Sequence, residues 1–115
     1  MSSIFSIAQS GLQANTLRLA VSANNVANTL TEGFVPSSVV QSDVAGGGVE
    51  AKVVKNDPQR EAQIDRSIVG LSSGTELGTE LVGQMTTASA FKANLASLRT
   101  ADDLLATLMQ LHDQR

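Results

Sequence analysis

The chain has 115 residues, of which 42% are hydrophobic, 17% charged and 3% aromatic, and its formal net charge is −3. The absence of Cys excludes a disulfide framework, a thiolate zinc site and a cysteine nucleophile, and the single histidine, His112, gives little basis for acid–base or metal chemistry. The slight acidity and the scarcity of aromatic residues argue against nucleic-acid binding, for which a basic stripe and stacking aromatic rings are expected. Composition therefore predicts one small domain, 1–115, with no catalytic residue, cofactor or metal.

Residues 1–30 have the pattern of one long helix, in which Arg18 is the only charged side chain. The apolar residues follow one another at steps of three and four, with Thr16 filling the gap between Leu12 and Leu19. They are Phe5, Ala8, Leu12, Leu19, Ala23, Val26 and Leu30. A second apolar set lies beside this stripe: Ile4, Ile7, Ala14, Leu17 and Val21. The helix is expected to end at Thr31-Glu32-Gly33, where Gly33 can take the left-handed conformation.

Residues 31–78 form a short middle segment of a different kind, which holds both prolines and the run Gly46-Gly47-Gly48. Stretches 35–44 and 49–54 predict two short strands, and the three glycines between them suit the loop of a β-hairpin. A turn is expected at Asn56-Asp57-Pro58, and a mobile linker at 67–78.

Residues 79–113 return to helical spacing, close to a heptad repeat, with Thr79 as the candidate N-cap. The apolar positions are Leu81, Met85, Ala88, Phe91, Leu95, Leu98, Ala101, Leu105, Leu108 and Leu111. The expected fold class is therefore mainly α, with two long terminal helices and an irregular or hairpin-like middle. Two helices packed along one seam cannot cover both apolar sets of the first helix, which predicts self-association or docking into a larger assembly.

Several segments near the two ends of the chain closely resemble the bacterial flagellar axial family, which comprises rod, hook and hook-associated proteins. Near the N-terminus these are Ser10-Gly11-Leu12-Gln13-Ala14, the run from Leu19 through Asn24-Asn25-Val26-Ala27-Asn28 to Thr29, and Gly33-Phe34. Near the C-terminus they are Leu77 to Met85, Ala90-Phe91-Lys92-Ala93-Asn94 and Thr100 to Leu108. The short middle segment is most similar to a small proximal-rod subunit of the flagellar basal body.

This resemblance implies terminal helices that pair as a coiled coil, and subunits that stack into a hollow axial tube. It implies a place in the periplasm-spanning rod of the basal body, reached through the flagellar type III export apparatus. The N-terminal sequence lacks the basic region of a cleaved signal peptide, as that route would require. The implied partners are further copies of the chain and other axial proteins, with no nucleic acid and no direct membrane insertion.

The candidate interface residues come from the apolar stripes and the resembling segments. They are Phe5, Leu12, Leu19, Asn24, Asn25, Val26, Asn28, Gly33, Phe34, Leu81, Met85, Phe91, Asn94, Leu95, Leu98, Leu105 and Leu108. The three asparagines have two open interpretations, as hydrogen-bonding groups between subunits or as caps of their own backbone. Phe34 and Phe91 are expected first as core residues.

Two functions from different classes fit this sequence. The favoured one is a structural rod subunit that polymerises and transmits torque without chemistry. The alternative is a non-polymerising helical adaptor or regulatory paralogue that binds axial subunits. An enzyme is not expected, because no nucleophile stands with an evident base and no glycine loop precedes a helix.

Overall fold

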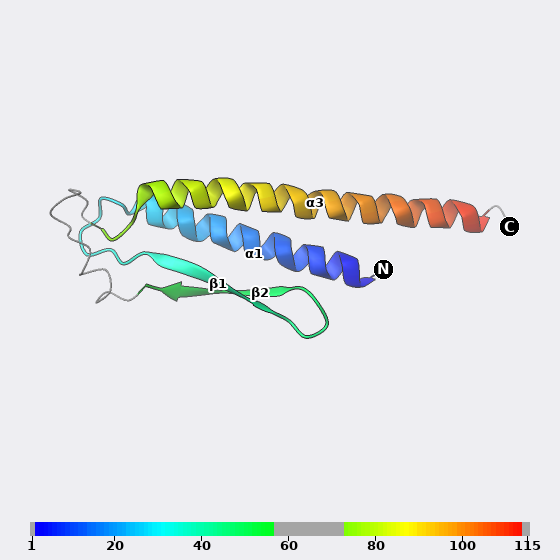
Figure 1. Ribbon diagram of the computed structural model, residues 1–115, viewed down its shortest axis with the longest axis horizontal. Helices are drawn as coiled ribbons and strands as arrows, with labels where there is room; N and C mark the ends of the chain where they lie inside the picture. Colours follow the sequence, from blue (N-terminus) through cyan, green and yellow to red (C-terminus); the bar gives the residue numbers. More distant parts are fainter. Residues whose placement is uncertain (1, 57–72, 114–115) are drawn as a thin grey trace.

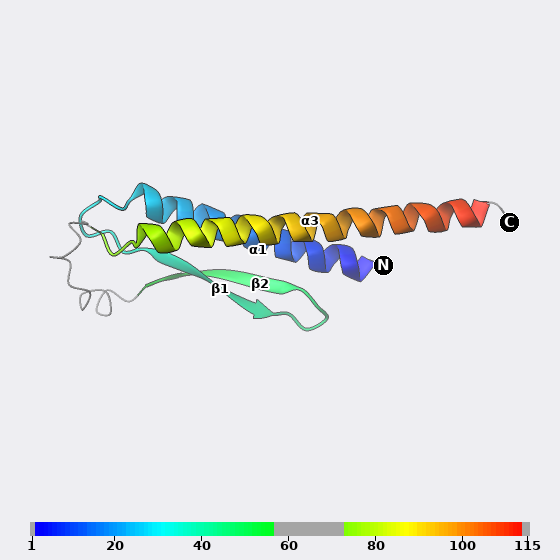
Figure 2. The ribbon, with the colours of Figure 1, turned by 45° about the horizontal axis from the view of Figure 1, so that its top comes forward.

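The computed structural model describes residues 2–56 and 73–113, with side chains from Ile4 onward. Its elements are, in chain order, α1 (Ser2–Ala27), β1 (Ser37–Asp43), β2 (Val49–Lys55) and α3 (Leu77–Asp113). The helices run antiparallel and side by side, and both strands pack against α1 (Figures 1 and 2). The expected fold class, mainly helical with two long helices and a short hairpin between them in sequence, is confirmed.

The helix α1 ends at Ala27, three residues earlier than the predicted span of 1–30. The N–H of Asn28 still bonds to the carbonyl of Asn24 at 3.1 Å, but the backbone then tightens into bonds between residues three apart. These bonds join Thr29 to Val26, Thr31 to Asn28 and Phe34 to Thr31. Gly33 has the predicted left-handed conformation, with a φ of 71°.

The two predicted strands form an antiparallel hairpin whose register runs from Ser37 opposite Lys55 to Asp43 opposite Val49. Gly46, Gly47 and Gly48 in its loop have φ values of 102°, 99° and 97°, which L side chains rarely adopt. A Cβ on Gly48 would also lie 2.6 Å from the hydroxyl of Ser10 in α1. The loop therefore needs glycine both for its turn and for its close approach to α1.

Ser10 anchors the hairpin to α1 through its hydroxyl group. The hydroxyl accepts a hydrogen bond from the N–H of Val49 at 3.1 Å and donates one to the carbonyl of Ile7 at 2.7 Å. Because the Val49 N–H belongs to the first residue of β2, this bond fixes where the second strand begins along α1.

The helix α3 begins at Leu77, so the prediction of Thr79 as its N-cap is wrong. The carbonyl of Glu76 accepts the first helical hydrogen bond, from the N–H of Glu80 at 3.0 Å. Thr79 lies inside the first turn, where its hydroxyl donates to the Glu76 carboxylate at 3.3 Å. The carbonyl and carboxylate of Glu76 thus start the helix two residues earlier than the sequence pattern predicted.

Two predictions for the middle segment concern residues that are only partly described. The expected linker at 67–78 is wrong for Leu77 and Gly78, which belong to α3, and its part up to residue 72 lies outside the described residues. The turn expected at 56–58 is described only at Asn56, whose N–H bonds to the carbonyl of Pro36 at 3.0 Å.

The interior of the described chain is small and largely polar. Apart from Pro36, its buried apolar side chains are three alanines, Ala8, Ala14 and Ala101. The buried polar side chains are Asn15, Asn25, Thr29, Ser73, Thr75 and Thr87. The large apolar side chains are mostly half-buried or exposed, so this chain alone leaves much apolar surface in contact with water.

Candidate assembly interface

The seam of α3 against α1 follows a heptad spacing, but on a different stripe from the predicted one. Steps of four and three connect the half-buried or buried positions Glu80, Gln84, Thr87, Phe91, Asn94, Leu98, Ala101 and Leu105. The predicted stripe shares four members of this series, Phe91, Leu98, Ala101 and Leu105. In the first turns of α3, the residues that meet α1 are therefore polar.

Asn25 is the centre of a hydrogen-bond network that joins α1, β1 and α3. Its side chain is 2% exposed, and its amide nitrogen donates to the carbonyl of Ser37 and to the carboxylate of Glu80, both at 2.7 Å. Its amide oxygen accepts the N–H of Ser37 at 3.0 Å. Both N–H groups of the amide are thus used inside one chain.

Ser22 and Gln84 continue this polar contact one turn along the helices. The amide of Gln84 donates to the hydroxyl of Ser22 at 3.1 Å, and that hydroxyl lies 3.5 Å from the carbonyl of Glu80. Ser22 also lines a cleft of about 250 Å³ between α1, β1 and the start of α3, together with Arg18 of α1. The cleft is open and lined by both polar and apolar groups.

Two of the resembling segments meet in the middle of the helix pair. A Cβ on Gly11 would lie 2.5 Å from the amide nitrogen of Asn94, so the glycine admits the asparagine side chain against α1. Next to this contact, Leu12 of α1 and Phe91 of α3 line one open apolar groove. The Ser-Gly-Leu segment of the first helix thus packs against the Ala-Phe-Lys-Ala-Asn segment of the second.

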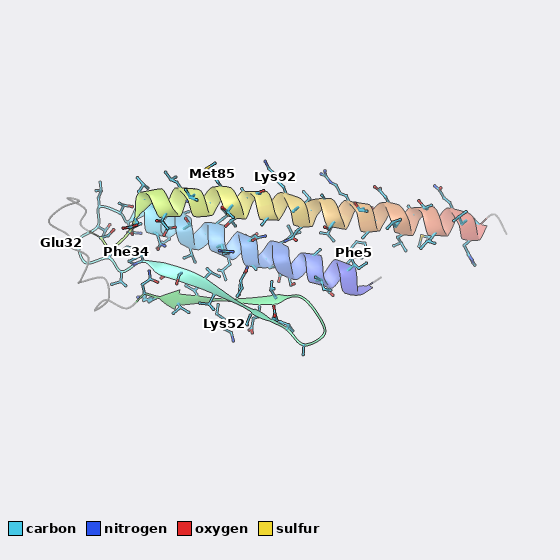
Figure 3. All side chains as sticks on the ribbon, viewed as in Figure 1. Phe5, Glu32, Phe34, Lys52, Met85 and Lys92 are labelled. Atoms are coloured by element: carbon cyan, nitrogen blue, oxygen red, sulfur yellow. The ribbon has the colours of Figure 1, made fainter. Side chains whose placement is uncertain are left out.

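The predicted interface residues fall into three groups in the structure. Eleven of them are half-buried or buried: Phe5, Leu12, Leu19, Asn25, Val26, Phe34, Phe91, Asn94, Leu95, Leu98 and Leu105. Exposed on this chain are Asn24, Gly33, Leu81, Met85 and Leu108. Figure 3 shows Met85 and Lys92 extending from the side of α3 away from α1.

The remaining member, Asn28, bonds within its own turn. Its amide donates to the carbonyl of Asn24 at 2.9 Å, and its oxygen accepts the hydroxyl of Thr31 at 3.2 Å. Of the two interpretations for the asparagines, local backbone capping describes this side chain within the chain, whereas Asn25 bonds to distant elements.

Sequence reasoning missed the polar half of the seam, formed by Ser22, Glu80, Gln84 and Thr87. The signal in the sequence was the heptad step from Glu80 through Gln84 and Thr87 to Phe91. A search for apolar periodicity passes over such a run, because it registers only large apolar side chains.

The charged groups of the described residues are dispersed. No cluster of three or more metal-binding side chains occurs among the residues that the structure describes, and no helix described there is long and apolar enough to cross a membrane. Within 2–56 and 73–113, the only ion pair joins Lys52 to Glu50 at 3.3 Å on the exposed outer face of the hairpin (Figure 3). The arrangement is suited to packing between helices.

Fold and interface together define a helical protein with a thin polar seam and large apolar side chains left uncovered. Comparison with known families adds a more particular finding. Residues 5–34, which span most of α1 and the turns before β1, match the family described as flagella basal body rod protein. This match agrees with the resemblance seen in the N-terminal segments of the sequence and supports a role related to the flagellar rod. No curated protein matches the chain.

Proposed function

We propose that this chain is a structural subunit of the flagellar basal-body rod that self-assembles through its terminal helices. The observation that carries the proposal is the match of residues 5–34 to the basal-body rod family. The matched segment contains Asn25 and Gly11, two of the residues through which α1 contacts α3, so it includes most of one side of the helix pair.

The distribution of apolar side chains supports an assembled state. Exposed large apolar residues occur on both helices and on the hairpin, among them Ile4, Val40 and Met85. Water contact with such surface is unfavourable by about 25 cal/mol per Å², so covering it with neighbouring subunits favours association. In the proposed rod, the partners are further copies of the chain and other axial proteins, and the chain reaches the rod through the flagellar type III export apparatus.

In the proposed interface, the candidate residues make two kinds of contact, within the chain and between subunits. Asn25, Asn94 and Phe91 hold the chain's own helices together, whereas the exposed Leu81, Met85 and Leu108 contact neighbouring subunits. The whole chain, 1–115, acts as one domain in this proposal, because α1 is the shared packing partner of the hairpin and of α3.

An adaptor that binds axial subunits without polymerising is the second candidate. It is favoured by one observation, that the family match ends at residue 34 and leaves α3 outside it. In such an adaptor the exposed side chains of α3 would bind a different axial protein.

The experiment is deletion of the gene, with imaging of the flagellar base, and detection of a labelled chain in purified basal bodies by electron microscopy. A rod subunit gives truncated or missing rods in the deletion strain and label along the rod in the complemented strain. Label confined to the cytosol, with rods of normal length in the deletion strain, would contradict the proposal and favour the adaptor.

A further inference from the structure

The hairpin leaves one edge of β1 without a partner strand, and the hydrogen bonds at the two ends of the hairpin identify the residues along that edge. The N–H of Val44 bonds to the carbonyl of Gly48, and the N–H of Asn56 bonds to the carbonyl of Pro36. In an antiparallel pair, hydrogen-bonded residues alternate with residues whose N–H and C=O groups point away from the partner strand. In the observed register, four residues turn these groups to the free edge: Ser37, Val39, Gln41 and Asp43.

Asn25 already occupies the first position along this edge. Its side-chain amide accepts the N–H of Ser37 at 3.0 Å and donates to the carbonyl of Ser37 at 2.7 Å, as a residue of a third strand would. Beyond it, the N–H and C=O groups of Val39 and Gln41 have no hydrogen-bond partner among the described residues. Unpaired groups of this kind are a template for a further strand. Asn25 stops such a strand at Ser37 and leaves the edge open from Val39 onward.

The cleft between α1, β1 and the start of α3 lies beside the open part of this edge. Val39 lines it together with Arg18 of α1 and Thr87 of α3. Although Thr87 is buried, its hydroxyl makes no hydrogen bond to another described residue, and Arg18 makes no ion pair within 2–56 and 73–113. The cleft therefore offers a guanidinium group and a hydroxyl group, both without partners in the chain, next to an unpaired strand edge.

The position of Arg18 along α1 indicates which part of the edge it faces. Arg18 precedes Asn25 by seven residues, which is about 10 Å of helix. The strand β1 starts beside Asn25 and runs back along α1, so that the hairpin loop lies beside Ser10 (Figure 1). A length of 10 Å corresponds to about three residues of strand. Arg18 is therefore level with Val39 and Gln41, the two residues whose backbone groups are free.

We propose that the free edge of β1 binds an extended peptide segment of a partner protein, and that an acidic side chain of this segment contacts Arg18. A peptide residue opposite Val39 exchanges two backbone hydrogen bonds with it, and its side chain lies on the same face of the sheet as that of Val39. This is the half-buried face of β1, toward α1. A carboxylate in this position can form charge-assisted hydrogen bonds with the guanidinium group.

The charges near the edge restrict the peptide to one acidic residue. Glu80 places a carboxylate at the Ser37 end, where Asn25 binds it, and Asp43 lies at the other end of β1. Like charges directly opposite one another are unfavourable in a sheet. The expected ligand is therefore a short extended segment with one central acidic residue and uncharged residues on both sides. The proposal goes beyond the rod function and does not depend on it.

The test is a binding titration with the full-length chain and a synthetic probe. The probe is the peptide Thr-Val-Thr-Glu-Thr-Val-Thr, amidated at its C-terminus and labelled with fluorescein at its N-terminus, and fluorescence anisotropy at low salt measures its Kd. One control peptide has lysine in place of the glutamate. A second has N-methyl groups on the glutamate and both valines, which removes the N–H groups that would pair with β1.

Three variants of the chain locate the binding site. Arg18→Gln removes the charge in the cleft, and its matched control is Lys92→Gln, since Lys92 is an exposed lysine that extends from α3 away from α1 (Figure 3). Gln41→Pro removes an N–H that faces the free edge and takes part in no bond between β1 and β2. Circular dichroism verifies that each variant keeps its helices.

The wild-type chain should bind the glutamate peptide at least about tenfold more tightly than either control peptide. Arg18→Gln should bind the glutamate and lysine peptides equally, Lys92→Gln should keep the wild-type preference, and Gln41→Pro should weaken binding of the glutamate peptide severalfold. Equal affinity for the N-methylated peptide would overturn the proposal, as would an Arg18→Gln variant that keeps the preference for glutamate.

Amide hydrogen exchange of the same complex provides a second readout that does not rely on a variant. Bound peptide should slow exchange at Val39 and Gln41 and leave Val40 unchanged, because the N–H of Val40 already pairs with β2. Unchanged exchange at Val39 and Gln41 would contradict edge binding. Exchange at these two amides that is already slow in the free chain, and slower at higher concentration, would show that a second copy occupies the edge and would also overturn the proposal.

Discussion

At the scale of single residues, Asn25 connects three elements through one buried amide. It bonds to both backbone polar groups of Ser37 and to the carboxylate of Glu80, so its removal takes this partner from three polar groups on half-buried residues. The turns after α1 and the start of β1 depend on this residue for their position.

We expect Asn25→Ala to lower the free energy of unfolding by about 2 kcal/mol, because it removes three hydrogen bonds and leaves their partners on half-buried residues unpaired. Asn24→Ala is the matched control, since Asn24 is exposed and the change should stay within about 0.5 kcal/mol. Urea denaturation at low protein concentration measures both. Equal losses from the two variants would contradict the role of Asn25 as the connecting residue.

The glycines of the hairpin loop permit a second residue-scale prediction. Gly46 and Gly48 both have positive φ, but only Gly48 has a neighbouring atom where a Cβ would stand. Gly46→Ala should therefore cost about 1 kcal/mol for its backbone conformation alone. Gly48→Ala should cost about 1–2 kcal/mol more, because the new methyl group displaces the Ser10 hydroxyl from Val49. Thermal and urea denaturation of the two variants measures the difference between their free energies of unfolding. Equal losses of stability in the two variants would mean that the loop is not held against α1.

At the scale of the elements, the two helices meet along a seam that is polar at one end and apolar at the other. Near the start of α3 the contacts are hydrogen bonds between Ser22 and Gln84 and between Asn25 and Glu80. Further along they become the packing of Leu12, Phe91 and Ala101. Polar contacts of this kind favour one register of the helices, because a shift along the seam would separate these donors from their acceptors.

A pair of substitutions two residues apart on α3 tests which stripe faces α1. Thr87 is 4% exposed and Met85 is 74% exposed. Thr87→Lys should lower the unfolding free energy by about 2–3 kcal/mol, since it places a charge in the seam, whereas Met85→Lys should change it by less than about 0.5 kcal/mol. Both are measured in dilute solution, where association does not contribute. The reverse order of effects would restore the apolar stripe that the sequence favoured.

At the scale of the whole molecule, the small core and the large exposed apolar surface lead us to predict that the stability of the folded chain depends on its concentration. Binding of folded chains to one another stabilises the folded state by mass action. We expect the Tm to rise by at least about 5 °C over about a hundredfold increase in concentration, given the shift per kcal/mol typical of a domain this size. Calorimetry measures the Tm at each concentration, and analytical ultracentrifugation measures the state of association. The Tm of a Met85→Lys, Leu108→Lys double variant should not depend on concentration. A wild-type chain that stays a well-folded monomer at high concentration would contradict it.

The sequence by itself determined the elements of this protein. Helical spacing in both terminal segments, the strands on either side of Gly46-Gly47-Gly48 and the left-handed Gly33 depend on neighbouring residues, so they can be read from local pattern. The segments around Gly11, Asn25 and Phe34 also sufficed to indicate the flagellar rod family. Helix ends were less accurate, because the hydrogen bonds of Asn28 and Glu76 shift them by two or three residues.

Only the tertiary structure decided which face of α3 meets α1 and which stays exposed. The sequence favoured Leu81 and Met85 for the seam because they are large and apolar. The structure places Glu80, Gln84 and Thr87 there instead. The physical reason is that α1 presents small and polar groups at these turns, and Asn25, 55 positions before Glu80, supplies the partner that makes burial of the carboxylate favourable. A bond between such distant residues leaves no periodic signal in the chain, and the large apolar side chains Leu81 and Met85 stay exposed.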